Sequence, residues 1–380
     1  ASPIRGMTGN ITQIRADKVW ELGYTGKGIT VAVLDTGVNT DHVDLKDHLW
    51  NDGNGNHGWN ALEKNYSIND AQGHGTHCAG TICGDGSSGT QTGIAPDATL
   101  MCIKVLSDEG SGTFDATISG VEYAIANGAH VLSLSLGSGM VDGSGNLLYS
   151  DQATGEYYYD LTARMARQTF SNALAHGVVA AVAAGNDGEW VAGNAPRPRN
   201  VNIPGNCPPP WIHPDQQANA GGTTSVISIG AVDYYDNVTS FSGRGPVTWN
   251  TATINTSGNI NGNFYEGYSD YPYNPEIGLI RPDVVAPGYN ITSSSNENNT
   301  GFVTMSGTSM ATPCDTGAMA LLLEANSKLT PAQICEALET NAVKLPTSTS
   351  TKNNDYGSGR IDIYASVLSV VDVELVAPEL

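Results

Sequence analysis

Residues 31–37 read V-A-V-L-D-T-G, a short run of β-branched and apolar residues that ends on the carboxylate of Asp35. A run of this kind, bounded by glycine, predicts a buried β-strand at residues 29–34. Asp35 therefore stands at the carboxyl end of a predicted strand, the edge at which ligand sites collect in open α/β sheets. Four comparable runs follow along the chain, at residues 99–105, 130–134, 178–183 and 225–232.

Segments with apolar residues at helical spacing separate these runs, at residues 115–127 and 161–176. The alternation predicts an α/β fold of three layers, in which helices cover both faces of a mostly parallel sheet. Pro313 fits the first turn of a last helix, where amides have no acceptor within the helix, so Ser309 is expected at that helix's N-terminus. One face of this helix gathers small and apolar residues, namely Met310, Cys314, Gly317, Ala318, Leu321, Leu322 and Ala325.

The chain of 380 residues is strongly acidic, with 17 Lys and Arg against 38 Asp and Glu and a formal net charge of −21. Such a surface repels phosphate backbones and anionic lipids, so neither nucleic acid nor a membrane is an expected partner. The opening Ala-Ser-Pro indicates a processed chain in a secreted or extracytoplasmic setting. Buried free thiols are predicted for Cys78, Cys83, Cys102 and Cys314, which leaves an intracellular location open.

Three segments interrupt the alternation, at residues 139–160, 189–222 and 247–279, and none has apolar periodicity of its own. They are predicted to be long surface loops on one domain that spans residues 1–380. Residues 368–380 are expected to form a tail or a linker.

Four polar residues stand at the predicted ends of core elements: Asp35, His74, Asn186 and Ser309. Each alone has a purely structural interpretation, as a turn, a helix cap or a core side chain. The amide of Asn186 also suits a developing oxyanion, and a helix start at Ser309 favours negative charge. Zinc is not expected at His74 and His77, because no H-E-x-x-H pattern or third ligand accompanies them.

Six blocks closely resemble the signature blocks of the subtilisin-like serine proteases, the subtilases, and they occur in the order of that family. They are D-T-G-V, H-G-T-H-C-A-G-T, S-L-S-L-G, A-A-G-N, R-P-D-V-V-A-P-G and G-T-S-M-A-T-P. The resemblance runs from about residue 11 to residue 367, apart from the three long loops. It implies a subtilisin-like fold and a serine endopeptidase.

By position, the resemblance implies that Asp35 orients His74, which acts as general base and then as general acid. Ser309 would attack the peptide carbonyl. Asn186 and the backbone N–H of Ser309 would form the oxyanion hole. The expected partners are protein or peptide substrates and the enzyme's own propeptide, as folding aid and inhibitor, and the protein is expected to be a monomer.

The resemblance also assigns two walls that bind substrate. Ser135, Leu136 and Gly137 resemble the strand that pairs with an extended substrate. Ala184 and Gly185 resemble the opposite wall of the pocket for the side chain before the cut. Because both walls carry small residues, a large apolar side chain is the expected preference.

Two positions depart from the family pattern. Cys314 and Asp315 follow G-T-S-M-A-T-P where relatives carry His and an apolar residue, and an early Asp in a helix suits the helix dipole. Asp44 matches a family calcium ligand, which predicts a structural calcium ion, but the partner loop at residues 85–91 holds a single carboxylate.

Three rival interpretations remain open. Asp-Thr-Gly occurs at both Asp35 and Asp315, as in a two-lobed aspartic protease, although that class is all-β. Acid-active serine carboxyl peptidases share the fold but use Glu in place of the His, so Q-G-H-G-T-H at residues 72–77 counts against that class. A degenerate subtilase that only binds its targets is the non-enzyme alternative.

Overall fold

A computed structural model describes residues 6–139, 149–151, 156–188, 200–216, 222–247, 279–345 and 352–371. Its centre is a seven-stranded sheet in the order β11-β10-β9-β6-β2-β5-β3, in which neighbouring strands run parallel. The strands are β2 (Thr30–Asp35), β3 (Gly58–Asn60), β5 (Thr99–Lys104), β6 (Val131–Leu134), β9 (Val179–Ala183), β10 (Val226–Val232) and β11 (Val284–Pro287). The predicted fold class and all five predicted strands are confirmed. Much of each predicted surface loop lies outside the described residues.

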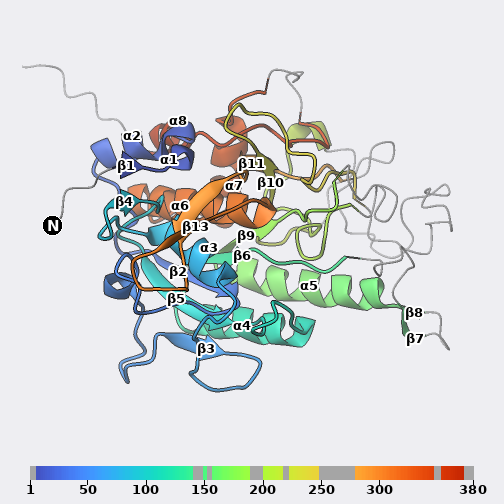
Figure 1. Cartoon of the computed structure of the whole chain (residues 1–380). Helices are drawn as coiled ribbons and strands as arrows, with labels where there is room; N and C mark the ends of the chain where they lie inside the picture. The colour runs from blue at the N-terminus through green and yellow to red at the C-terminus, as the bar shows by residue number, and fades with distance from the viewer. Residues whose placement is uncertain are drawn as a thin grey trace, which may run out of the picture.

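Helices cover both faces of this sheet (Figure 1). One face carries α3 (His74–Cys83) and α6 (Thr308–Ala325), with α1 (Gly9–Gln13), α2 (Ala16–Glu21), α7 (Pro331–Thr340) and α8 (Ile363–Val370). The other face carries α4 (Phe114–Ala126) and α5 (Tyr158–Ala175). Side chains of β2 alternate accordingly, because successive residues of a strand point to opposite faces. Val31 and Val33 join the core under α3 and α6, whereas Ala32 and Leu34 join the core under α4.

Short strand pairs decorate the periphery. Strands β1 (Gly6–Met7) and β4 (Thr90–Gln91) pair in parallel. Strands β12 (Ile291–Ser294) and β13 (Phe302–Met305) form an antiparallel hairpin that leads into α6, and β7 (Tyr149–Asp151) pairs with β8 (Glu156–Tyr157). Short 3-10 turns lie at Lys46–His48 and Pro214–Gln216. None of the described helices is long and apolar enough to cross a membrane.

Helix α6 differs from its predicted form in three ways. Its residues from Met310 to Leu323 are buried on every side, so burial extends beyond the single apolar face that the spacing of its residues indicates. Pro313 is its sixth residue, in the second turn, where a missing N–H leaves the carbonyl of Ser309 without its helical donor. Asp315 is its eighth residue, too far from the N-terminus for the helix dipole to explain a carboxylate there.

A fully buried group of ion pairs ties the C-terminal segment to β11. The ammonium group of Lys352 lies 2.7 Å from Asp283 Oδ1 and 2.9 Å from Glu339 Oε1, and Arg281 pairs with the same oxygen of Asp283. Two cations and two carboxylates thus compensate each other, as buried charges must. The six cysteines are all buried and free, which confirms the four predicted thiols and adds two more.

Candidate active site

Asp35 and His74 meet at the carboxyl edge of the sheet, as their positions predict. Asp35 is the last residue of β2 and is 1% exposed, and its two oxygens lie 2.8 and 2.9 Å from His74 Nδ1. His74 is the first residue of α3. A Cβ on Gly75 would lie 2.1 Å from the carbonyl oxygen of Gly37, so only glycine lets α3 approach the end of β2 this closely.

The pKa of His74 reflects two opposing effects. Burial disfavours the imidazolium, but the adjacent carboxylate of Asp35 outweighs it and raises the pKa well above 6.5. The imidazole therefore stays protonated to a higher pH than a free histidine does.

We expect kcat/KM to rise with pH through an ionisation above 6.5, because only neutral His74 can accept the proton of a serine. The rate of cleavage of a peptide p-nitroanilide, measured from about pH 5 to 10, checks this. A pH optimum of about 3 to 4, or inhibition by pepstatin, would instead favour the paired aspartates of the aspartic-protease interpretation.

Ser309 is the second residue of α6 and is partly buried, and Cys78 Sγ contacts both its carbonyl and His74 Nδ1. Its hydroxyl donates to the carbonyl of Ser135 (3.0 Å) and not to His74, so a rotation about its side chain must precede proton transfer. Catalytic hydrogen bonds are often absent before substrate binds. The carbonyl of Ser309, freed by Pro313, accepts instead from Ser135 Oγ at 2.8 Å and from Cys78 Sγ at 3.5 Å.

Asn186 follows β9 and is exposed. Its Oδ1 accepts from the backbone N–H of Thr308 (2.9 Å) and from the Thr308 hydroxyl (3.0 Å). These two donors orient the amide so that its Nδ2 end faces away from Thr308. The sequence analysis assigned no role to Thr308, although its place immediately before Ser309 was a signal. The structure makes it the residue that positions Asn186.

A cleft of about 400 Å³ opens next to His74. The predicted residues Ser135, Leu136 and Gly137 form part of its lining. Its other side comes from the loop after β5, chiefly Leu106 and the segment 110–114, which the sequence analysis did not identify. The position of this loop, directly after a strand at the same sheet edge, was the available signal.

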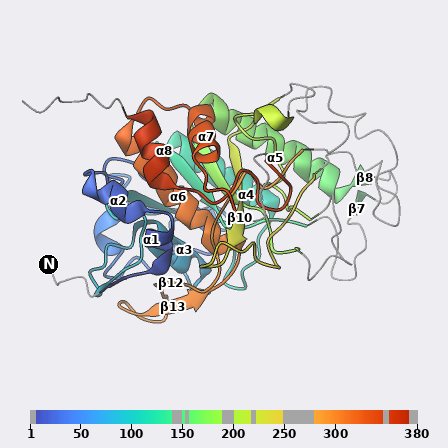
Figure 2. The same ribbon diagram turned by 90° about the horizontal axis from the view of Figure 1, so that it is seen from above.

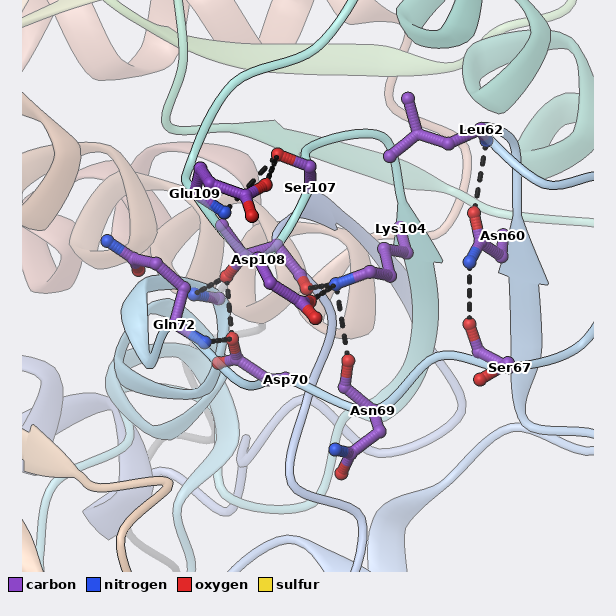
Figure 3. Close-up of polar contacts among 12 residues, drawn as sticks. Asn60, Leu62, Ser67, Asn69, Asp70, Gln72, Lys104, Ser107, Asp108 and Glu109 are labelled. Carbon is purple, nitrogen blue, oxygen red and sulfur yellow. Dashed lines mark hydrogen bonds and ion pairs between the residues drawn. The ribbon is translucent and has the colours of Figure 1, made fainter.

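The loop after β5 is anchored by a buried lysine (Figure 3). Lys104 Nζ lies 2.8 Å from Asp108 Oδ1 and 3.3 Å from the carbonyl oxygen of Asn69, and it also donates to the carbonyl of Thr36. One ammonium group thus joins the loop that lines the cleft to the residue after Asp35. The geometry of the cleft and that of the Asp35–His74 pair are coupled through it.

Ala184 and Gly185 are buried and are not among the residues that line this cleft. A Cβ on Gly185 would lie 2.7 Å from Asn202 Nδ2, and a Cβ on Gly137 would lie 2.9 Å from Asn202 Cβ. Asn202 therefore fills the space between the two predicted walls. Its Oδ1 has no partner among the described residues. Burial raises the pKa of Asp187, and a hydrogen bond from Asn202 opposes that rise.

Cys78 lies against the back of the candidate pair. Its Sγ is 3.9 Å from His74 Nδ1, and burial raises the pKa of the thiol, so it is a poor nucleophile. Asp35, His74 and Cys78 each offer a ligand atom within 4.8 Å of the others, a set that suits a soft metal ion. His77 takes no part, because its Nε2 faces the carbonyl of Ile291 at 3.0 Å.

A small mercurial should inhibit the native enzyme about a hundredfold, because a metal on Cys78 would push His74 out of line. Iodoacetamide should leave activity intact, since the thiol is fully buried. The measurement is residual peptidase activity after each reagent. Cys78→Val should stay active and resist the mercurial. Full mercurial inhibition of that variant would identify another cysteine, such as Cys314, as the sensitive one.

Asp44 does not have the surroundings of a calcium ligand. Its Oδ1 accepts from the backbone N–H of Ser88 and its Oδ2 accepts from the Ser88 hydroxyl, both at 2.6 Å. The nearby carboxylate of Asp85 lies 3.2 Å from His48 Nε2. Calcium binds about six to eight oxygen ligands that are directed at the ion. Both carboxylate oxygens of Asp44 instead accept hydrogen bonds from Ser88. The described residues here do not fit calcium.

Asp315 has no catalytic geometry. It is fully buried in α6, and neither of its oxygens has a partner among the described residues. Burial, reinforced by the charge of Asp283, raises its pKa to about 8. Asp35 is committed to His74, so the two Asp-Thr-Gly motifs do not form an aspartic-protease pair.

Comparison with known proteins gives one consistent result. A sequence model described as "Subtilase family" matches residues 26–359. Subtilisin Savinase of Lederbergia lenta is 32% identical, with 94% of this chain and 97% of the relative covered. Subtilisin DY of Bacillus licheniformis is 30% identical over the same shares of the two chains. The crystal structure of a cold adapted subtilisin-like serine proteinase aligns with a TM-score of 0.58 at 26% identity, covering 88% of this chain and 89% of that one.

Proposed function

The chain belongs to the subtilase family and is a subtilisin-like serine endopeptidase, and on that basis we propose that Asp35, His74, Ser309 and Asn186 carry out its hydrolysis of peptide bonds. The observation that carries this proposal is the contact of both Asp35 oxygens with His74 Nδ1 beside the N-terminus of α6. The Asp35 carboxylate holds the proton on Nδ1, which leaves Nε2 to accept the proton of Ser309.

The oxyanion would form between Asn186 Nδ2 and the backbone N–H of Ser309. Thr308 already holds the other end of the amide, so its orientation does not have to be established during the reaction. The first amides of α6 add the positive end of the helix dipole. The proton then passes from His74 to the leaving amine, and water repeats the sequence on the acyl-enzyme.

A fluorophosphonate probe tests the assignment directly, because it labels a serine only when an oriented base activates it. We expect one label per chain, on Ser309, located by peptide mass mapping. A folded protein that takes up no label and cleaves no peptide would support the alternative of a degenerate subtilase.

Substrate is expected to bind as an added strand along Ser135, Leu136 and Gly137, which line the cleft. For the pocket that receives the side chain before the cut, the structure supports a smaller space than the sequence predicts. Asn202 lies between Gly137 and Gly185, so the small walls do not create space for a large apolar group. We propose a preference for a small side chain there, with serine favoured over alanine because Asn202 Oδ1 has no donor among the described residues.

Asn202→Gly should raise kcat/KM for a peptide p-nitroanilide with phenylalanine before the cut by about tenfold or more, relative to its alanine counterpart. The physical reason is that the substitution opens the space between Gly137 and Gly185. The matched control is Asn54→Gly, in an exposed turn, which should leave the ratio unchanged. A wild-type enzyme that already prefers phenylalanine would overturn the role given to Asn202.

Several wider features remain part of the proposal. We infer one catalytic domain, which acts on protein substrates as a monomer, requires a propeptide for folding and works outside the cytoplasm. The charge of −21 supports an acidic exterior that avoids nucleic acid and anionic membranes. Calcium is not proposed at Asp44.

A further inference from the structure

We propose that a second pocket, outside the catalytic cleft, binds the guanidinium or ammonium group of an arginine or lysine side chain on a protein substrate. It is a cavity of about 390 Å³ that is lined by residues of α1, the turn after β10 and the start of β12. Figure 2 shows α1 and β12, two of the elements that carry these residues. We call it the tyrosine pocket and define it by Asn10, Gln13, Asp233, Tyr234, Tyr235 and Tyr289. The identity of the ligand rests on the proposed protease function.

Exposed aromatic rings surround this pocket. Tyr234, Tyr235 and Tyr289 are 67%, 78% and 50% exposed, and they are three of the seven large hydrophobic side chains exposed among the described residues. The rings of Tyr234 and Tyr235 lie 5.6 Å apart at 85° and so form a corner. The face of a tyrosine ring attracts a cation, which gives such a corner a natural occupant.

The polar groups of the pocket offer acceptors. Asn10 is 4% exposed, its Nδ2 donates to Cys314 Sγ at 3.5 Å, and its Oδ1 has no partner among the described residues. Gln13 Nε2 donates hydrogen bonds to the carbonyl of Asp233 (2.8 Å) and to Asp236 Oδ1 (2.9 Å). Both amides thus use their N–H groups within the protein and leave their oxygens available. Guanidinium and ammonium groups suit this lining because they are donors without acceptors, whereas a sugar brings both.

Charge favours the same ligand. The carboxylate of Asp233 accepts N–H groups from Tyr235 and Asn237 but forms no ion pair with a described cation. Asp236, by contrast, is compensated by Arg360 at 2.6 Å. One uncompensated carboxylate therefore lies in the pocket wall, on a chain whose net charge of −21 attracts cations in general.

The tyrosine pocket adjoins the segment that carries the nucleophile. The residues on either side of Tyr289 are bonded to the two residues that precede α6, through Gly307 N–H to the carbonyl of Gly288 (2.8 Å) and Asn290 N–H to Ser306 Oγ (2.8 Å). A protein substrate held by a basic side chain in this pocket therefore borders the catalytic segment.

The test titrates the Ser309→Ala protein with Nα-acetyl-arginine N-methylamide and follows binding by saturation-transfer NMR. The matched ligand is the citrulline analogue, which has nearly the same shape but no charge. We expect the arginine ligand to bind about tenfold more tightly, and Tyr289→Leu and Tyr234→Leu each to weaken it about fivefold. Tyr66→Leu, which removes a 54% exposed tyrosine elsewhere, should have no effect.

Equal binding of arginine and citrulline would overturn the proposal, as would arginine binding that both pocket variants leave unchanged, because it would then occur elsewhere, for instance in the catalytic cleft. The two ligands are compared on a protein whose tyrosine pocket is unchanged. This comparison therefore holds even if a pocket variant fails to fold. Fluorophosphonate labelling of the parent enzyme is measured in parallel. Loss of labelling refutes the protease assignment, whereas loss of charge selectivity refutes the tyrosine pocket.

Discussion

Replacing Ser309 with alanine should lower kcat/KM for a peptide substrate by roughly four to six orders of magnitude and leave the fold intact. The hydroxyl of Ser309 lies in the first turn of α6, close to the Asp35–His74 pair, because Cys78 Sγ contacts both the carbonyl of Ser309 and His74. Its loss removes the nucleophile but leaves Asn186 and the amides of α6, which account for the residual rate. Initial rates on a p-nitroanilide peptide, with circular dichroism as the folding check, measure the effect.

Asp315→Asn is the matched control, because it lies on the same helix six residues further on and touches no group of the site. It should retain most of the activity. Near-normal turnover by Ser309→Ala would mean that another residue attacks the peptide and that the assignment of the nucleophile is wrong.

Raising the pH should destabilise the protein through Asp315, and Asp315→Asn should abolish that effect. The pKa of this carboxyl is about 8 in the folded protein and 3.8 in model peptides. Above about pH 4 the unfolded chain releases the proton while the folded protein retains it, so the free energy of unfolding falls as the pH rises and levels off above about pH 8. The full penalty is about 6 kcal/mol.

Denaturant melts at about pH 5, 7 and 9, made in the Ser309→Ala background to prevent self-digestion, measure this penalty. The stability gained from Asp315→Asn should grow by about 1.4 kcal/mol per pH unit between about pH 4 and 8. Asp41→Asn, which replaces an exposed carboxylate, should leave the pH dependence as it is in the parent. A constant difference across the series would show that Asp315 has found a partner.

The sequence predicted the scaffold well because the scaffold depends on local patterns. Strand runs such as residues 29–34 are apolar on both faces, and this pattern identifies buried parallel strands wherever the chain brings them. The candidate residues Asp35, His74, Asn186 and Ser309 were assigned by the resemblance to the subtilases, and each lies at or near the end of a strand or helix.

Other features depend on contacts between distant segments, which no local pattern contains. Asn202 lies in a stretch without periodicity, so its place between Gly137 and Gly185 could not be foreseen, and for that reason the preference proposed here differs from the one that the sequence predicts. The burial of Asp315 was missed because Asp315 was expected early in α6, where a carboxylate suits the helix dipole, whereas it is the eighth residue of a helix that is enclosed on all sides. The donors of Ser88 on Asp44 were likewise not visible in the sequence.

The six buried cysteines react differently in the folded and in the unfolded protein. The folded chain has no disulfide for a reductant to break, and burial shields its thiols from mild oxidant. Once it unfolds in air, all of these thiols become available, and six cysteines can pair in about fifteen ways to make three bridges. Any such disulfide prevents the chain from refolding, so unfolding by heat or denaturant in air becomes irreversible. Purification, storage and any refolding step therefore call for a reductant that the working enzyme itself does not need.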